Sequence, residues 1–307
     1  MRFKGLDMNL LVALDCLLTE RNVSRAAEKL CLSQSATSGA LTRLREYFDD
    51  ELLVQLGRNM VMTPRAAELL PAVRNVLLQV EGTIIKRPDF DPATARRDIR
   101  IIASDYMITV ALAPALRLIQ SQAPDLNFHL LTPRENPREW LERGEVEFVI
   151  LPDIYLSPDH PSVQLFSETY SAVVWTENDL VRSDTLSLDD FLTMRHVTVN
   201  FIETGPSFEE LFAQRFGAER VGDVSTSSYS SVPHLIVGTR RLALMHRRMA
   251  ETFAAFLPLK LLTPPVEIPP ICETLQWHIY NDSDNCLNWV RRELVRHIAG
   301  DPPETDR

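Results

Sequence analysis

The sequence predicts an α/β protein that begins with a smaller, all-α domain. In the first 63 residues, apolar side chains recur at helical spacing, apart from two short alternating runs near the end of that segment. From residue 98 to residue 300, strand-like and helix-like patterns alternate, as they do in α/β domains. A helical pattern over 64–86 and a polar, proline-containing hinge over 87–97 separate the two parts. A length of 307 residues is consistent with two domains.

Three helices are predicted before residue 46. The first, LDMNLLVALDCLLTER, carries leucines at helical spacing and supports the two that follow. The second runs from Val23 to Leu30, with small alanines where another helix must approach closely. Ser33 ends the intervening turn and is expected to cap the third helix. We expect the buried face of the third helix to consist of Ala36, Ala40, Leu41 and Leu44.

The third helix has the composition of a DNA-reading helix. An amide and several hydroxyls at its N-terminus can reach base edges, and the arginines that follow can hold phosphates or guanine. The alternative is an ordinary amphipathic hairpin with a solvated polar face.

The flanking sequence favours DNA binding. Two short apolar runs on either side of Gly57-Arg58-Asn59 predict a two-stranded wing, and Arg58 at its tip is expected to enter the minor groove or touch phosphate. Three helices and a wing make a winged helix-turn-helix, which we assign to 6–63, with the helix-turn-helix itself at 23–42.

The net charge of −10 agrees with DNA binding only because the acidic excess lies elsewhere. Residues 1–63 carry eight basic and eight acidic side chains, and residues 21–45 carry five basic side chains against the single acid Glu28. A local basic face is sufficient for phosphate binding, and an acidic remainder discourages non-specific coating of DNA. With few phosphate contacts per chain, tight binding calls for a dimer.

The linker segment 64–86 is predicted to be one helix that pairs with a second copy. Thr63 is its expected N-cap, Pro64 stands at its first position, and an apolar seam runs along it. Pro71 is expected to kink it. The alternative is a helix packed on its own domain.

The region 98–300 is predicted to form two lobes around a largely parallel sheet arrangement. We assign 98–165 and 266–300 to the first lobe and 166–265 to the second. Ligands of such folds bind in the crevice at the carboxyl ends of the strands.

Other classes of protein are disfavoured. The four cysteines show neither disulfide nor zinc spacing, no apolar run is long enough for a bilayer, and no signal peptide is evident, so we expect reduced thiols in the cytoplasm. No His-Glu-x-x-His, phosphate-binding glycine loop or Gly-x-Ser-x-Gly occurs, so we expect no enzyme, metal or cofactor.

From end to end the chain resembles the LysR-type transcriptional regulators. The winged helix-turn-helix, the linker sequence TPRAAELL, the hinge and the two-lobed domain carry the likeness. The opening MRFKGLDMNLLVALDCLLTERNVSRAA with SQSATSGALTRLR resembles the nodulation and aromatic-degradation subgroup, including regulators of chlorophenol breakdown. The family usually has proline after the recognition-helix glutamine, where this chain has Ser35.

The resemblance implies a periplasmic-binding-protein-like effector domain and a homodimer or homotetramer that bends promoter DNA. A small aromatic co-inducer between the lobes would change that bend and recruit RNA polymerase, which makes the protein an activator. By position, the implied DNA contacts are Gln34, Ser35, Thr37, Ser38, Arg43, Arg45, Arg58 and Arg65.

The resemblance also implies an effector site. Its positions in this sequence are Ser104, Asp105, Tyr106, Met107, Thr132, Pro133, Thr169, Asn200, Phe201, Thr204, His246 and Arg248. Hydroxyls with one arginine suit a phenolate or carboxylate on an apolar ring. Relatives that bind aromatic acids often have histidines at the positions of Thr169 and Pro206, which leaves room here for a more apolar phenol.

Three of these positions have a simpler interpretation. Asp105 would also serve as a helix cap. Arg248 would also fit as a solvent-exposed side chain at the start of a helix, and His246 as a strand-end histidine whose ring nitrogens are hydrogen-bonded. At the level of function, the alternatives are a regulator that responds to a non-aromatic metabolite and a redox sensor acting through cysteines. An architectural DNA-binding protein would not need the two-lobed domain.

Overall fold

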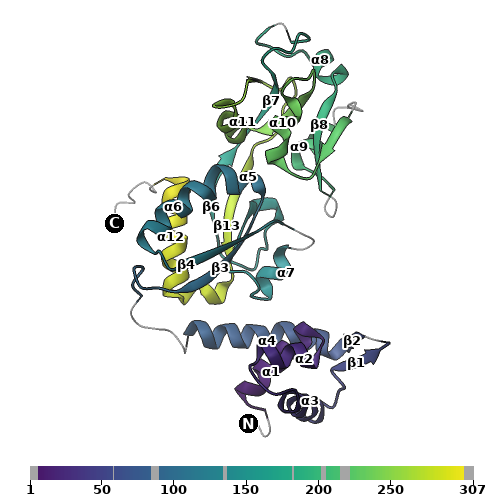
Figure 1. The fold of residues 1–307 in the computed structure, drawn as a ribbon, viewed down its shortest axis with the longest axis vertical. Helices are drawn as coiled ribbons and strands as arrows, with labels where there is room; N and C mark the ends of the chain where they lie inside the picture. Colours follow the sequence, from purple (N-terminus) through teal and green to yellow (C-terminus); the bar gives the residue numbers. More distant parts are fainter. Residues whose placement is uncertain are drawn as a thin grey trace. The chain divides into compact units, whose positions relative to one another are not determined.

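The computed structural model describes residues 6–57, 59–83, 90–133, 137–181, 183–201, 205–214 and 222–300. The chain divides into two compact units, one built mainly from residues 1–88 and the other mainly from residue 89 onward (Figure 1). Each unit is described by itself.

The N-terminal unit is a winged helix-turn-helix followed by a long helix. Its elements are α1 (Met8–Glu20), α2 (Val23–Lys29), α3 (Gln34–Phe48), β1 (Leu53–Leu56), β2 (Asn59–Met62) and α4 (Pro64–Thr83). Side-chain oxygens of Asp7, Asn22 and Ser33 cap α1, α2 and α3, each accepting a hydrogen bond from a backbone amide three residues on. Local capping chemistry therefore sets where these helices begin.

The core of this unit is made of leucines and small residues from all three helices, the wing and α4. Its most buried members include Leu14, Leu17, Leu18, Ala26, Leu44, Leu52, Leu53 and Ala66. Each buried leucine contributes about 1.5–3 kcal/mol relative to exposure. The face of α3 that meets this core contains Thr37, Leu41 and Leu44, whereas Ala36 is exposed. The expectation that Ala36 is buried was therefore wrong.

Helix α4 is continuous past Pro71, and its first half packs on its own domain. Ala66, Leu70 and Val73 are buried in the core, while Val76 is 42% exposed. The Arg74 guanidinium ties α4 to α1 by donating to the Asp15 carboxylate at 2.6 Å and to the Thr19 hydroxyl at 2.6 Å. Beyond Val73 the seam is more exposed, although Leu77 still packs partly against this core.

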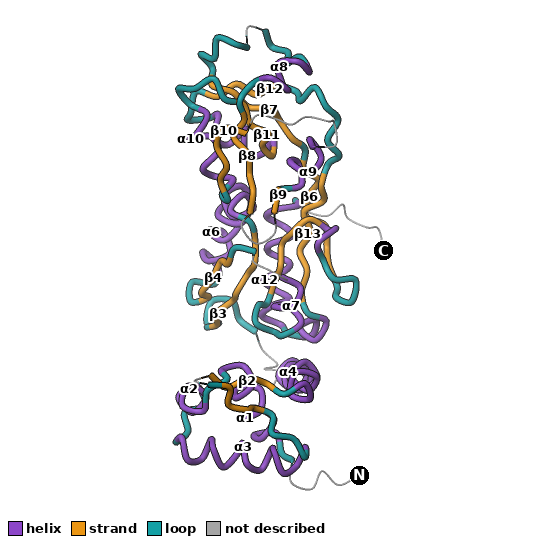
Figure 2. Tube along the Cα trace, turned by 90° about the vertical axis from the view of Figure 1, so that its right-hand side faces the viewer, coloured by secondary structure: helices purple, strands orange, loops and turns teal. Residues whose placement is uncertain are grey.

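The second unit contains two lobes, each built on one sheet (Figure 2). Among the described residues, the sheet of lobe 1 has five strands and that of lobe 2 has six. Lobe 1 has the strand order β4-β3-β5-β13-β6, from β3 (Arg97–Ala103), β4 (Leu126–Leu131), β5 (Phe148–Pro152), β6 (Ser162–Glu168) and β13 (Ile271–Trp277). Helices α6 (Ala113–Gln122) and α12 (Asn285–Ala299) lie side by side on this lobe, and α7 (Pro137–Glu142) connects β4 to β5 (Figure 1).

Lobe 2 has the strand order β10-β8-β11-β7-β12, with β9 paired to β8. Its strands are β7 (Tyr170–Trp175), β8 (His196–Phe201), β9 (Gly205–Pro206), β10 (Gly222–Thr226), β11 (Leu242–His246) and β12 (Leu259–Leu262). Its helices are α8 (Leu188–Thr193), α9 (Phe208–Gln214), α10 (Val232–Ile236) and α11 (Arg247–Ala254).

The sheets are largely parallel, as the sequence led us to expect, but one strand in the main order of each runs the opposite way. In lobe 1, β4, β3, β5 and β6 share one direction and β13 is reversed, and in lobe 2, β10, β8, β11 and β12 share one direction and β7 is reversed. The physical reason is that the chain crosses between lobes twice. It leaves lobe 1 at the end of β6 and enters lobe 2 as β7 after Thr169, then returns from β12 to β13.

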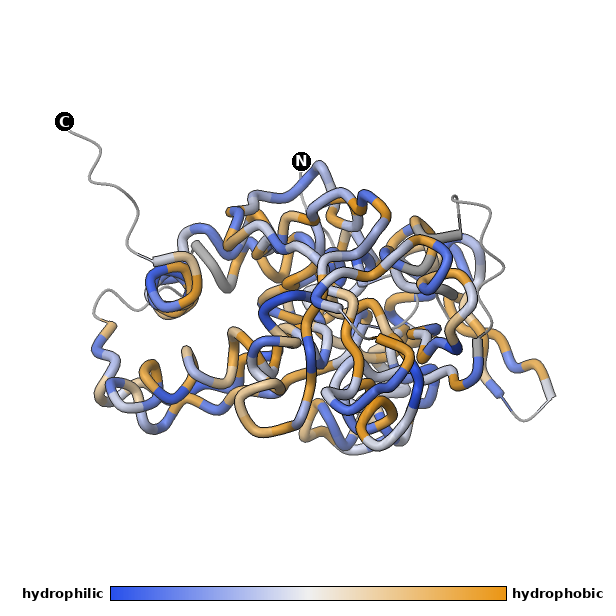
Figure 3. Tube along the Cα trace, turned by 90° about the horizontal axis from the view of Figure 1, so that it is seen from above, coloured by the Kyte–Doolittle hydropathy of each residue, from blue (hydrophilic) through white to orange (hydrophobic). Residues whose placement is uncertain are grey.

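The helical segment that follows β3 has three parts. A short α5 (Asp105–Met107) leads into a π-helical stretch, Ile108–Leu112, and then into α6. Short π-helical insertions often accompany functional sites. Apolar residues recur at intervals along the helices (Figure 3). No helix of the described residues is long and apolar enough to cross a membrane.

Candidate DNA-binding interface and effector site

The N-terminal turn of α3 presents a row of exposed polar side chains. Gln34, Ser35 and Ser38 are exposed, as the DNA-reading hypothesis requires. The Ser33 hydroxyl accepts from the Ala36 amide at 3.1 Å and lies 3.0 Å from the Ser35 hydroxyl. Ser35, at the position where a proline was expected, therefore forms a hydrogen bond with the capping residue.

Thr37 does not belong to this exposed row. Its side chain is fully buried, and its hydroxyl donates to the Ser33 carbonyl at 3.1 Å. A buried side chain whose donor is already used inside its own helix cannot reach a base edge. The prediction of Thr37 as a DNA contact is therefore wrong in this structure.

The arginines predicted to contact DNA fall into two groups: exposed ones, and one whose guanidinium is hydrogen-bonded within the protein. Arg43 is 57% exposed, with its guanidinium 3.6 Å from the Asp7 carboxylate. Arg65 is 55% exposed and pairs with Glu68 at 3.2 Å. Arg45, by contrast, donates from Nε and Nη2 to the backbone carbonyls of Glu51 and Leu53, so these two nitrogens hold the turn and the first strand of the wing. Arg58 lies outside the described residues.

In the second unit, Asp105 joins the two lobes. Its carboxylate accepts from the Ser228 hydroxyl at 2.8 Å, from the Ser230 amide and hydroxyl at 2.9 Å each, and from the Tyr229 amide at 3.3 Å. Ser104 caps α5 by accepting from the Met107 amide at 3.2 Å. Asp105, which was predicted to contact the effector, is therefore bound by lobe 2. A role as a helix cap does not account for these hydrogen bonds between the lobes.

Tyr106 lies at the centre of a buried aromatic group at the same junction. Its ring stacks on the His246 imidazole with centroids 4.0 Å apart, and its hydroxyl donates to the Glu168 carboxylate. Tyr229 and Tyr170 also contact His246, with centroids 4.7 and 5.1 Å from the imidazole. Burial lowers the pKa of His246 to about 3, so the imidazole is neutral at physiological pH. Burial and the neighbouring Glu168 raise the pKa of Tyr106 well above its usual value.

Arg248 interacts with lobe 1 and is not simply a solvated helix start. Its guanidinium lies over the Phe166 ring, 4.1 Å from the centroid, and 3.8 Å from the Glu168 carboxylate. Its side chain is 50% exposed. One face of the cation is therefore free to meet a ligand while the other holds the junction.

The other predicted effector residues are more dispersed. Met107 is fully buried in the core, Phe201 packs edge-on to Tyr229, and Asn200 donates to the hydroxyls of Thr198 and Ser225. Thr132 and Thr169 are exposed, and Pro133 is partly buried. Thr204 lies outside the described residues. Met107 is thus a core residue, and a direct role in ligand contact is not supported by its position.

Sequence reasoning missed two buried acids at the junction. Glu168 and Glu273, each 2% exposed, lie near one another on the paired strands β6 and β13. Burial, followed by the charge of Glu168, raises the pKa of Glu273 to about 8. The available signal was an acid in each of the strands SVQLFSE and ICETLQW.

Three buried polar atoms of this group have no hydrogen-bond partner within the described part of the chain. They are Glu273 Oε2, the Tyr170 hydroxyl and His246 Nδ1. Buried polar atoms are nearly always paired with protein, water or ligand. Together with the exposed face of Arg248, they provide hydrogen-bonding positions beside a stack of aromatic rings.

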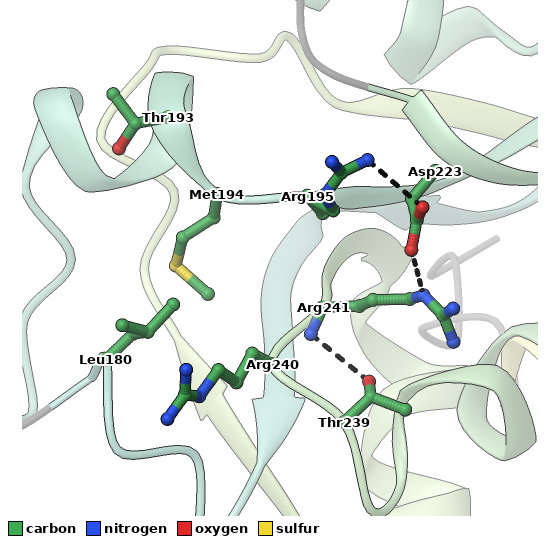
Figure 4. Close-up of a pocket in the computed structure, with 8 residues that line it drawn as sticks. All are labelled: Leu180, Thr193, Met194, Arg195, Asp223, Thr239, Arg240 and Arg241. Carbon is green, nitrogen blue, oxygen red and sulfur yellow. Dashed lines mark hydrogen bonds and ion pairs between the residues drawn. The ribbon is translucent and has the colours of Figure 1, made fainter.

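A separate pocket of about 330 Å³ lies in lobe 2 (Figure 4). It is lined by Leu180, Thr193, Met194, Arg195, Asp223, Thr239, Arg240 and Arg241. The guanidinium groups of Arg195 and Arg241 both hold Asp223, and the Arg241 hydrogen bond lowers the pKa of that carboxyl. Arg240 pairs with Asp179 at 2.7 Å. The cations of this pocket are thus neutralised by carboxylates, and no predicted effector residue lines it. Among the described residues, no cluster of metal-binding side chains occurs.

Comparison with protein families gives two matches that together span most of the chain. Residues 8–67 match the bacterial regulatory helix-turn-helix proteins of the lysR family, and residues 92–297 match the LysR substrate binding domain. The chain is 40% identical over 300 residues to nodulation protein D 1 of Mesorhizobium japonicum, covering 97% of this chain and 95% of the relative. It is 39% identical to nodulation protein D 3 of Rhizobium meliloti over 300 residues, covering 97% and 96%.

Solved structures share the architecture. A probable transcriptional regulator from Pseudomonas aeruginosa superposes with a TM-score of 0.62 at 30% identity, covering 94% of this chain and 96% of that one. A full-length OxyR variant from the same organism has a TM-score of 0.74 at 15% identity over 98% of both chains, which shows the fold alone. The family, the relatives and the neighbours are regulators and not enzymes. The chain belongs to the LysR family of DNA-binding transcriptional regulators.

Proposed function

We propose that this LysR-family regulator is an activator whose co-inducer is a small hydroxylated aromatic molecule bound at the junction of the two lobes. The observation that carries the proposal is the buried group around Tyr106 and His246, where stacked rings lie beside polar atoms without partners. An apolar ring would pack on such a stack, and its hydroxyl groups would supply the missing hydrogen bonds.

The charges at the junction favour a neutral phenol over an aromatic carboxylate. The Glu168 carboxylate is 2% exposed, and the Arg248 guanidinium lies only 3.8 Å from it. A carboxylate ligand would meet the Glu168 carboxylate at short range, whereas a phenol hydroxyl can donate to it. Flavonoids and lightly chlorinated phenols have a neutral hydroxyl at physiological pH, whereas salicylate carries a carboxylate.

On the DNA side, the proposed contacts are Gln34, Ser35, Ser38 and Arg43 on α3, with Arg58 and Arg65 on the sugar-phosphate backbone. The exposure of the described members of this set supports the assignment. We further propose that the chain acts in the cytoplasm on promoter DNA as a homodimer or homotetramer, and that it recruits RNA polymerase. The similarity to nodulation D proteins over nearly the whole chain supports this role.

Thermal unfolding of the full-length protein against a ligand panel tests the co-inducer class. The panel contains flavonoids, chlorophenols, salicylate and non-aromatic metabolites. A ligand that binds the folded protein raises its melting temperature, and the rise grows with ligand concentration. We expect a rise with neutral hydroxylated aromatics that Tyr170→Phe weakens, because that variant removes only the unpartnered hydroxyl. Tyr47→Phe, the same change at a tyrosine that is 41% exposed in the N-terminal unit, is the control.

A rise in melting temperature with the non-aromatic metabolites alone would overturn the proposal and indicate a non-aromatic co-inducer. A response to peroxide that is abolished when the four free cysteines are replaced would favour redox sensing.

A further inference from the structure

We propose that Arg45, Asp50 and Thr63 are positioning residues that set the wing against the recognition helix α3 and the start of α4. The proposal depends on the DNA-binding role of the family and is independent of the co-inducer. Arg45 then acts on DNA through the wing and not by its own contact.

Arg45 binds the wing by three interactions. Its Nε donates to the Glu51 carbonyl at 2.7 Å, its Nη2 donates to the Leu53 carbonyl at 2.6 Å, and the Glu51 carboxylate lies 3.2 Å away. Leu53 is the first residue of β1. A guanidinium with donors in a fixed planar arrangement can hold two carbonyls at once, which sets the angle at which the strand leaves α3.

The turn between α3 and β1 has a backbone that needs such support. Asp49 and Leu52 have positive φ values of 49° and 58°, a region that residues other than glycine seldom occupy. Leu52 is fully buried. The Asp50 carboxylate accepts from the Leu52 amide at 2.6 Å and so holds the turn in this conformation.

Thr63 connects the same turn to the linker helix. Its hydroxyl donates to the Asp50 carboxylate at 2.6 Å and accepts from the Ala66 amide at 3.1 Å, and its own amide donates to the Leu52 carbonyl at 3.0 Å. One hydroxyl thus caps α4 and closes the base of the wing. The hydrogen bonds run without a gap from the turn after α3, through Asp50, to the first turn of α4.

This arrangement predicts that the wing is ordered before DNA arrives. A wing held at the correct angle binds DNA without first losing conformational freedom. Disruption of the network would therefore weaken binding even though every side chain that touches DNA is still present.

The test uses the full-length protein without and with DNA. Amide hydrogen exchange is followed over 53–56 and 59–62 in the DNA-free protein, and affinity is measured for duplexes that the wild type selects from a random-sequence library. The variants are Arg45→Gln, which keeps length but removes the charge, and Thr63→Val, which keeps shape but removes the hydroxyl. Thr63→Ser retains the hydroxyl, and Arg65→Ala removes an exposed arginine outside the network.

We expect Arg45→Gln and Thr63→Val to speed wing exchange and to lower affinity by about tenfold, equivalent to about 1.4 kcal/mol. Thr63→Ser should match the wild type in both measurements, and Arg65→Ala should lower affinity with unchanged wing exchange. Weaker binding by Arg45→Gln with unchanged wing exchange would show that Arg45 contacts DNA itself and would overturn the proposal. Faster amide exchange in the wing with unchanged affinity for DNA would also overturn the proposal, because the position of the wing would then have no effect on DNA binding. Sizing and thermal unfolding confirm that each variant is folded.

Discussion

The Asp105 carboxylate lies 2.9 Å from both the backbone amide and the hydroxyl of Ser230, and this pair joins lobe 1 to lobe 2. The two residues are 125 positions apart in the sequence. A carboxylate that accepts from two hydroxyls and two amides is well satisfied, so Asp105 holds the lobes together in this conformation.

Replacing Asp105 is expected to loosen the lobes. Asp105→Ala removes the four hydrogen bonds that this carboxylate accepts from lobe 2. Each hydrogen bond to a charged acceptor contributes about 1.5–3 kcal/mol, and the four contributions are not additive. We expect faster amide exchange over 228–231 and a lower midpoint of urea unfolding. Asp159→Ala, at an exposed position of the same lobe, is the control. Unchanged exchange at 228–231 in Asp105→Ala would contradict the assignment.

The pH dependence of stability is expected to carry two opposite contributions from the junction. The folded pKa of His246 is depressed to about 3, so its contribution is fully present above about 6.5 and is lost as pH falls toward 3. The folded pKa of Glu273 is raised to about 8, so its contribution is fully present below about 4.5 and is lost as pH rises toward 8. Glu168 and Asp153 face Glu273 and oppose its ionisation.

Between about pH 6.5 and pH 8, only the Glu273 contribution changes, and the stability of the wild type should fall. Glu273→Gln should flatten this part of the profile because glutamine does not titrate. Urea unfolding at several pH values measures both curves. An equal slope in wild type and variant would mean that Glu273 is ionised in the folded protein.

Exposed and buried polar residues of α3 should differ in their effect on DNA binding. Arg43→Ala removes an exposed cation, and the slope of log affinity against log salt should become shallower by about 0.9 for each phosphate that Arg43 neutralises in the wild type. Thr37→Val removes a buried hydroxyl and should leave operator preference unchanged. Titrations at several salt concentrations check both. A Thr37→Val protein that is folded but has altered base preference would restore Thr37 as a DNA-contacting residue.

Two valines of α4 should behave differently when replaced by aspartate. Val73 is 6% exposed and belongs to the core of its own domain, so Val73→Asp should unfold that domain. Val76 is 42% exposed, so Val76→Asp should leave the fold intact and lower the oligomeric state if this face pairs with a second copy. Sizing with circular dichroism separates the outcomes. An unchanged oligomer in Val76→Asp would place the pairing surface elsewhere.

Much of the fold could be predicted from the sequence because its helices depend on near neighbours. Capping by Ser33 and the helical spacing of Leu14, Leu17 and Leu18 are local properties, and both are present in the structure. The reversed strand in the main order of each sheet could not be predicted in the same way. Strand direction depends on which distant strand becomes the neighbour, and the antiparallel placement of β13 between β5 and β6 follows from the return of the chain from lobe 2.

The helices and strands that carry the candidate site residues could be predicted, but the contacts of each side chain could not. The polar N-terminus of α3 and the residues after β3 lie where their patterns indicated. Thr37 was misassigned because helical spacing alone does not say whether a threonine or an alanine meets the core. Glu168 and Glu273 were missed because their proximity arises only when β6 pairs with β13.

The sequence by itself determined that this protein is a winged helix-turn-helix joined to a two-lobed α/β domain, since periodicity, caps and motifs act over a few residues. Only the tertiary structure decided that Arg45 binds the wing and that Asp105 binds the opposite lobe. The physical reason is that a charged side chain takes whichever donors or acceptors the fold brings within about 3 Å, and those partners can lie anywhere in the chain.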